Sequence, residues 1–262
     1  MSDTLVVNEI YLSIQGESSF AGLPCVFVRL TACNLRCSYC DTAYAFGQGK
    51  KMSPGEVRAR VQELAGPYIG GTKDPDRPRQ GEADGMPGRA GGDTLPLVEL
   101  TGGEPLLQPG SLPLMQSLCD DGFTVLLETS GALDISPVDP RVRRIMDLKC
   151  PSSGEVERNR WENLPHLKAS DEIKFVIGTR EDYEWAKAQL TGNRLAAVCP
   201  ILFSWVTPLQ PRQQDNSLKP VPAGQTPISR LELVEQILAD ALPARFQLQM
   251  HKFIWPPDQR GV

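Results

Sequence analysis

The sequence predicts an α/β protein built as a partial (β/α) barrel of about six mostly parallel strands with reduced helices. Short apolar, β-branched runs alternate with segments of helical period, which is typical of a mostly parallel sheet. The 262 residues must also hold a stretch at 70–96 in which 11 of 27 residues are glycine or proline. Such a stretch buries too little surface to offset its ordering entropy. We therefore expect a single domain, 1–262, with a disordered surface insert at 70–96.

Local patterns place the elements in order. Apolar runs at 6–12 and 25–30 predict the first two strands, and Ser-Pro-Gly-Glu at 53–56 is a capping box that begins a helix. Alternation of apolar and polar residues over 246–253 predicts a last strand with His251 on its polar face. Further strands are expected at 97–100, 124–127, 145–148, 173–177 and 196–202, with helices near 112–118, 181–190 and 228–242.

Composition narrows the class of partner. A net charge of −5 and a pI near 5.2 argue against direct nucleic-acid binding, which favours a basic surface. No apolar run approaches the roughly 20 residues that span a bilayer, and the first residues lack the pattern of a secretory leader. We expect a cytoplasmic protein that acts on a small molecule and has no membrane partner.

Three cysteines within eight residues carry the strongest chemical signal. Cys33, Cys37 and Cys40 have C-x3-C-x2-C spacing and directly follow the second predicted strand. Three thiolates can hold three irons of a [4Fe–4S] cluster and leave the fourth iron open for a ligand. Structural zinc is the alternative, but it usually needs a second Cys or His pair, and none has comparable spacing. The other cysteines occur singly, which favours buried reduced thiols over disulfides: Cys25, Cys119, Cys150 and Cys199.

Polar segments follow four of the predicted strands. Each is weak evidence alone, because a polar segment after a strand is often only a solvated loop or a helix cap. If the strands are parallel, their carboxyl ends meet at one rim, where barrel proteins place their active sites. We therefore expect all four to lie on the same rim as the cysteines: 15–17, 101–105, 128–131 and 147–153.

The cysteine spacing, with Tyr39 before the last cysteine and a Gly-Gly-Glu-Pro segment at 102–105, resembles the radical S-adenosylmethionine (SAM) superfamily. Within it, several segments in order resemble the 7-carboxy-7-deazaguanine synthase family: 9–17, 27–30, 40–42, 251–255 and 260–262. The resemblance implies a fold of the radical SAM type. It also implies that SAM binds the open iron and is cleaved by one electron to a 5′-deoxyadenosyl radical, which takes a hydrogen atom from the substrate.

The family resemblance assigns roles to particular residues. Cys33, Cys37 and Cys40 would bind the [4Fe–4S] cluster, and Thr42 would bind Mg2+. Glu17, Arg29 and His251 would act in catalysis. SAM would be held by Tyr39, Asp41, Gly103, Glu104, Ser130, Lys149 and Ser204. The substrate would be held by Ile14, Gln15, Gly16, Glu17, Arg29, Thr101 and His251.

The implied reaction is that of a carbon–nitrogen lyase. It converts 6-carboxy-5,6,7,8-tetrahydropterin to 7-carboxy-7-deazaguanine with loss of ammonia, a step of 7-deazapurine (queuosine) biosynthesis. The implied partners are the pterin substrate, an electron donor such as flavodoxin or ferredoxin, and a second copy of the chain in a homodimer. Two other readings stay open: a radical SAM activase that makes a glycyl radical on a protein, and a zinc or redox module without enzymatic activity. Iron, sulfide and zinc analysis separates the last from the enzymes.

Overall fold

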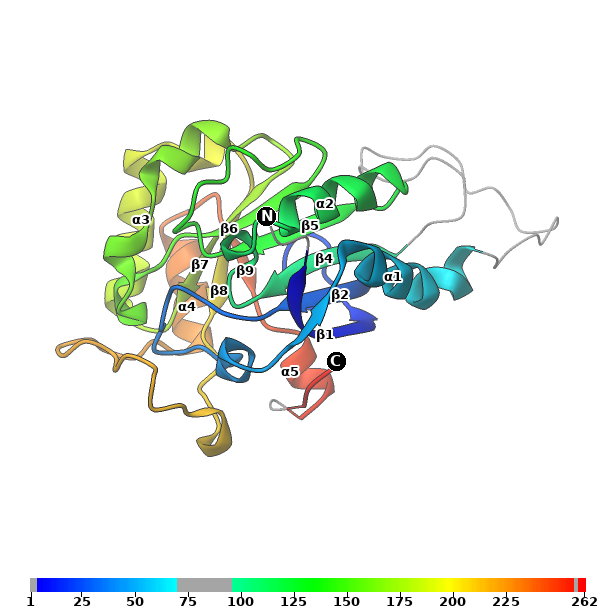
Figure 1. Cartoon of the computed structure of the whole chain (residues 1–262). Helices are drawn as coiled ribbons and strands as arrows, with labels where there is room; N and C mark the ends of the chain where they lie inside the picture. Colours follow the sequence, from blue (N-terminus) through cyan, green and yellow to red (C-terminus); the bar gives the residue numbers. More distant parts are fainter. Residues whose placement is uncertain (1–3, 70–95, 257–258) are drawn as a thin grey trace, which may run out of the picture.

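One continuous sheet forms the body of the protein (Figure 1). The computed structural model describes residues 4–69, 96–256 and 259–262, so the predicted insert lies outside the described residues except for Pro96. Over the described residues, nine strands pair in the order β3-β1-β2-β4-β5-β6-β7-β8-β9. Their bounds are β1 Leu5–Ile14, β2 Pro24–Leu30, β3 Lys50–Met52, β4 Leu97–Gly102, β5 Val125–Thr129, β6 Arg143–Asp147, β7 Glu172–Ile177, β8 Ile201–Trp205 and β9 Arg245–Gln247.

Of the five α-helices in the described residues, four connect successive strands and pack on the sheet's outer face, and the fifth follows the last strand. They are α1 Pro54–Ile69, α2 Ser111–Asp120, α3 Arg180–Gly192, α4 Arg230–Ala239 and α5 His251–Ile254, together with several 3-10 turns. The predicted capping box begins α1: Ser53 N donates to Glu56 Oε2 at 2.7 Å, and Glu56 N donates to Ser53 Oγ at 3.2 Å. In the described part of the chain, none of the helices is long and apolar enough to cross a membrane.

Strand direction confirms the predicted class and corrects the predicted strand number. From β2 to β9 the strands are parallel, as expected of a partial barrel. Nine strands are described where about six were expected; β2 and β4 to β9 form the parallel set, and the three-residue edge strand β3 has no counterpart among the predicted runs. Moreover, β1 pairs antiparallel with β2, so Ile14 lies opposite Pro24 at the end where β2 begins.

A two-residue period separates the two faces of the sheet. Val26, Val28 and Leu30 of β2 point outward into a core shared with α1 and α2, while Phe27 and Arg29 point inward and line a cavity. A second outer core joins β6, β7 and β8 to α3 and α4. Helices α1 to α4 therefore cover one face of the sheet, and the other face is left for the site.

Two predicted strands differ from the structure. The stretch 246–253 leaves the sheet after Gln247, because Met250 N donates to Gly16 O at 3.0 Å and α5 follows. His251 therefore lies on a short helix and not on a strand. The stretch 196–202 begins as a 3-10 turn, and β8 starts only after Pro200, which has no N–H to donate to a strand partner.

Candidate active site

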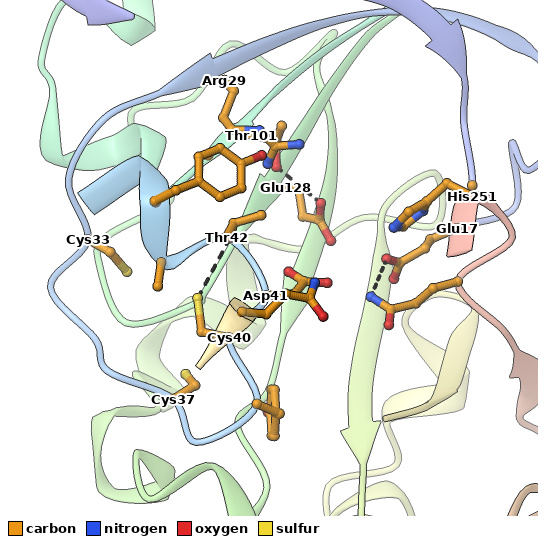
Figure 2. Close-up of a pocket in the computed structure, with 18 of the residues that line it drawn as sticks. Glu17, Arg29, Cys33, Cys37, Cys40, Asp41, Thr42, Thr101, Glu128 and His251 are labelled. Atoms are coloured by element: carbon orange, nitrogen blue, oxygen red, sulfur yellow. Dashed lines mark hydrogen bonds between the residues drawn. The ribbon is translucent and has the colours of Figure 1, made fainter. Parts of the chain in front are cut away.

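A cavity of about 630 Å³ runs along the inner face of the sheet. Figure 2 shows Cys33, Cys37 and Cys40 on one side of it, Glu17 and His251 on the other, and Asp41 and Thr42 between them. The structure thus brings together most of the residues predicted for the site. Those that line the cavity are Ile14, Gln15, Gly16, Glu17, Arg29, Cys33, Cys37, Tyr39, Cys40, Asp41, Thr42, Thr101, Gly103, Ser130, Lys149 and His251.

The cysteine loop follows β2 at its carboxyl end. Burial raises the pKa of the Cys33 and Cys40 thiols and raises that of Cys37 to about 12. A bare thiolate is therefore disfavoured here, whereas a thiolate bound to iron is stabilised by the metal. Among the described residues, no three Cys, His, Asp or Glu side chains converge on a point that could hold a single metal ion. A [4Fe–4S] cluster needs a wider spacing, since each thiolate binds a different iron.

Two glycines let β4 end directly against the cysteine loop. A Cβ on Gly103 would lie 1.9 Å from Ala32 O, and one on Gly102 would lie 2.2 Å from Leu30 O. Gly102 also has φ of +134°, which side chains other than hydrogen rarely allow. These contacts explain why glycine occupies both positions before Glu104.

Glu104 and Ser204, both predicted to contact SAM, do not line the cavity. Glu104 is fully buried, and its carboxyl group accepts from Ser130 N at 2.8 Å, Ser130 Oγ at 2.6 Å and Leu106 N at 3.0 Å. It therefore supports Ser130, which does line the cavity, from behind. Ser204 is 1% exposed and lies on β8 between apolar neighbours.

Arg29 points into the cavity from β2, one residue before that strand ends. Its Nε donates to Glu9 Oε1 at 2.8 Å, and its Nη2 donates to the Tyr11 hydroxyl at 2.9 Å. A guanidinium group carries five N–H donors. The two contacts fix its orientation and leave further donors for a ligand in the cavity.

Gln15, Gly16 and Glu17 reach the cavity from the opposite end. Because β1 runs antiparallel to β2, these residues lie where the parallel strands begin, so the prediction that they share the cysteines' rim was wrong. Gln15 Nε2 donates to Glu99 Oε2 at 2.5 Å. This hydrogen bond holds the Gln15 side chain inside the barrel. A Cβ on Gly16 would lie 2.7 Å from His251 Nδ1, so glycine is what allows His251 to pack here.

Charged residues inside the strands were missed by sequence reasoning. Lys174 of β7 forms ion pairs with Glu17, at 3.2 Å, and with Glu128 of β5. Burial alone would raise the pKa of Glu128, but Lys174 holds it below its usual value. Burial and the nearby Glu128 raise the pKa of Glu99 well above its usual value. A charged residue within an otherwise apolar strand, as at Glu99 and Lys174, was the available signal.

Asp41 is tied to the helix that carries His251. Its Oδ2 lies 2.5 Å from Lys252 Nζ, whose side chain is only 4% exposed. Burial alone would raise the pKa of Asp41, but the Lys252 ammonium lowers it to about 2. Lys252 also donates to Gln249 Oε1 at 2.6 Å, and Gln249 Nε2 donates to Glu17 Oε1 at 3.1 Å. The cysteine end and the Glu17 end are thus linked through polar side chains.

The cysteine end of the cavity also offers polar atoms to a ligand. Lys149 Nζ lies 2.6 Å from Asp147 Oδ2, and this neighbour keeps the pKa of Lys149 above its usual value although burial opposes it. Three lining residues each have a buried oxygen without a partner among the described residues: Tyr39 Oη, Asp147 Oδ1 and Thr207 Oγ1. Buried polar atoms are normally paired. A ligand with amino, carboxylate and ribose groups, such as SAM, fits this donor set.

Known proteins resemble the chain over nearly its whole length. A protein of Koribacter versatilis named 7-carboxy-7-deazaguanine synthase is 42% identical over 98% of this chain and 99% of the relative. One of the same name from Chlorobaculum tepidum is 40% identical over 98% and 97%. The crystal structure of QueE from Escherichia coli matches the fold with a TM-score of 0.63, at 20% identity over 95% of both chains. No family model matches the chain.

The partial barrel and the three-cysteine loop define a radical SAM enzyme, which uses a [4Fe–4S] cluster and SAM. Identity of 40–42% over nearly the full length then shows the family. The chain belongs to the 7-carboxy-7-deazaguanine synthase family. The predicted enzyme class, a lyase that uses radical SAM chemistry in 7-deazapurine biosynthesis, is confirmed at the level of the family.

Proposed function

We propose that the protein converts 6-carboxy-5,6,7,8-tetrahydropterin to 7-carboxy-7-deazaguanine with loss of ammonia. The observation that carries this proposal is one continuous cavity lined by the three cysteines and by Glu17, Arg29 and His251. Its volume of about 630 Å³ lies within the usual range of small-molecule sites, about 300–1,000 Å³. When bound, the cluster and SAM supply hydrogen-atom abstraction from a substrate beside them.

Arg29 is the candidate clamp for the substrate carboxylate. Glu9 and Tyr11 hold its guanidinium group from one side, so its remaining donors are oriented before the substrate arrives. A guanidinium group can form paired, charge-assisted hydrogen bonds with a carboxylate. Holding that carboxylate still keeps the carbon next to it in place while its hydrogen is removed.

The acidic end of the cavity suits the nitrogen-rich edge of a pterin. Glu17 can accept hydrogen bonds from the ring N–H and amino groups, and Gln15 and Thr101 add further polar side chains. Ile14 and Gly16 form part of the cavity wall, and His251 packs over Gly16 and closes this end of the cavity. Glu17, Arg29 and His251 thus act on the substrate by orienting it and by holding its charge.

SAM would occupy the cysteine end. Tyr39, Asp41, Gly103, Ser130 and Lys149 line that end and would hold its methionine and ribose groups. We assign Glu104 and Ser204 a supporting role instead of the direct contact predicted from the family, because neither lines the cavity.

Thr42 is the proposed Mg2+ ligand. Its Oγ1 lies 3.7 Å from Cys40 Sγ, so its hydroxyl stands beside the cluster loop and within the cavity. Mg2+ prefers oxygen ligands and usually takes only one or two from protein. The ion would neutralise charge on the substrate carboxylate, together with Arg29.

Three wider expectations remain part of the proposal. A flavodoxin or ferredoxin would supply the electron, the active form would be a homodimer, and the product would enter queuosine-type biosynthesis. These three follow from the family resemblance. A cytoplasmic location is proposed with them, on the sequence pattern alone.

Anaerobic turnover tests the proposal. The reconstituted protein is incubated with reductant, SAM, Mg2+ and 6-carboxytetrahydropterin, and the deazapurine is detected by mass. We expect product without any protein substrate, which a glycyl-radical activase would require. A protein that carries about four irons per chain, the content of the assigned cluster, yet makes no product would contradict the proposed reaction.

Substitutions then test the assigned roles. Arg29→Lys keeps the charge but loses the paired donors, and we expect kcat/KM for the pterin to fall by roughly tenfold or more. Thr42→Ala should raise the Mg2+ concentration needed for half-maximal rate. Arg60→Lys, at an exposed ion pair with Glu63 on α1, is the matched control and should change neither value. Unchanged kinetics in both site variants would refute these roles.

A further inference from the structure

The middle of the cysteine loop is held by a turn from another part of the sheet. The 3-10 turn Pro151–Ser153 follows β6, and Glu155 comes two residues later. Arg36 N, directly before Cys37, donates to Glu155 Oε1 at 2.7 Å. On the other side of Cys37, Ser38 N donates to Ser153 O at 3.1 Å and Ser38 Oγ to Ser152 O at 2.7 Å.

The turn is itself fixed from below by a buried carboxyl group. Asp182, in the first turn of α3, is fully buried. Its Oδ1 accepts from Ser152 N at 2.7 Å, and its Oδ2 accepts from Ser152 Oγ at 2.5 Å and from Gly178 N at 2.9 Å. A chain of hydrogen bonds therefore runs from the start of α3 through the turn to the two neighbours of Cys37.

Glu155 has the features of a dedicated acceptor. It is 5% exposed, yet its Oε2 pairs at 2.9 Å with Lys219 Nζ, whose side chain is 47% exposed. Lys219 N also donates to Arg36 O at 2.9 Å, so Arg36 is bound through both its N–H and its C=O. A buried carboxyl group that accepts a backbone N–H is costly to replace, because the donor is left without a partner.

We infer that Glu155 is a positioning residue for the [4Fe–4S] cluster. It fixes the backbone before Cys37 while Ser38 fixes the backbone after it, so the thiol is presented at a set place. Metal ligands must be held within about 0.5 Å of their working position, and backbone contacts of this kind do so. The inference rests on the cluster part of the proposed function and not on the identity of the substrate.

Cluster retention measures this role without turnover. After anaerobic reconstitution, iron release to a chelator is followed by absorbance, and the cluster's reduction potential is measured in the same protein. We expect Glu155→Ala to release iron roughly tenfold faster, the change expected from losing one hydrogen bond to a charged acceptor. Glu155→Gln keeps an oxygen that can accept from Arg36 N, so it should retain iron nearly as well as the unsubstituted protein while its reduction potential rises through loss of the negative charge.

Two further variants separate positioning from general instability. Ser38→Ala removes one side-chain contact and should show a smaller effect of the same sign. Asp171→Ala is the matched control: Asp171 is fully buried and accepts from Arg144 N and Lys168 N, each at 3.0 Å, just before β7 begins. It should destabilise the fold without faster iron release from folded protein. Equal release rates in Glu155→Ala and unsubstituted protein, or equal acceleration by Asp171→Ala, would overturn the inference. Failure of the unsubstituted protein to bind iron would instead count against the proposed function.

Discussion

Glu104→Gln distinguishes a support beneath the cavity from a direct SAM contact. The carboxyl group accepts from two backbone donors, Leu106 N at 3.0 Å on Oε1 and Ser130 N at 2.8 Å on Oε2. Glutamine has a single carbonyl oxygen, so in either orientation one buried N–H faces an amide nitrogen. Leaving one such donor unpaired costs about 1–3 kcal/mol. Taking about 2 kcal/mol, we expect Tm to fall by about 4–8 °C for a chain of this size.

Thermal unfolding and SAM binding are measured on the same reconstituted protein. Because Glu104 does not line the cavity, SAM affinity should change by less than about threefold, equivalent to under 1 kcal/mol. Ser130→Ala is the comparison, since Ser130 lines the cavity and should weaken SAM binding more than it lowers Tm. An unchanged Tm together with a tenfold loss of SAM affinity in Glu104→Gln would refute the reasoning.

Three further outcomes are expected. Lys252→Met removes the partner that holds the pKa of Asp41 at about 2, so that pKa should rise toward the ordinary aspartate value. Acid unfolding, followed by titration, should then begin at higher pH. The affinity for SAM, measured by equilibrium dialysis, should fall. The pKa of Glu99 is raised in the folded state above its unfolded value, so its stabilising contribution is present at low pH and is lost as pH rises. Between pH 5 and pH 9 the free energy of unfolding, measured in urea, should therefore fall less for Glu99→Gln than for the unsubstituted protein. Gly16→Ala places a Cβ 2.7 Å from His251 Nδ1, so the KM for the pterin should rise several-fold while the Kd for SAM stays constant. Equal changes in the two constants would argue against a local effect.

The side chains of each strand point alternately to the two faces of the sheet, and this period explains how much of the site could be predicted. The cysteine loop and Arg29 were predictable, because a short motif follows a recognisable strand and Arg29 interrupts an apolar run. The same period of two would have placed Glu99 and Glu128 on the inner face with Arg29. Glu128 was predicted only as part of a segment after its strand, and Glu99 was not predicted, because the prediction placed the site at the strand ends, whereas this cavity also extends between the strand interiors.

Long-range pairing explains what could not be predicted. The direction of β1 decides which end of the barrel receives Gln15 and Glu17, and nothing in residues 5–14 distinguishes antiparallel from parallel pairing. Likewise, the alternation at 246–253 fits a strand equally well until Met250 N pairs with Gly16 O. Local pattern indicates an element, but contacts between distant parts of the chain set its direction and its end.

The contact between Gly16 and the segment around His251 has a consequence for synthesis of the protein. Residues more than 200 positions apart build the Glu17 end of the cavity, as the hydrogen bonds from Met250 N to Gly16 O and from Ser18 N to Gln247 Oε1, at 3.1 Å, show. By contrast, Glu155 and the turn before it, which hold Arg36 and Ser38 of the cysteine loop, come earlier in the chain. During synthesis on the ribosome, the residues that support the cysteine loop are therefore available early, and the Glu17 end of the cavity is closed only after residue 251 has been added. A nascent or prematurely ended chain would carry the cluster loop without the wall that confines its chemistry.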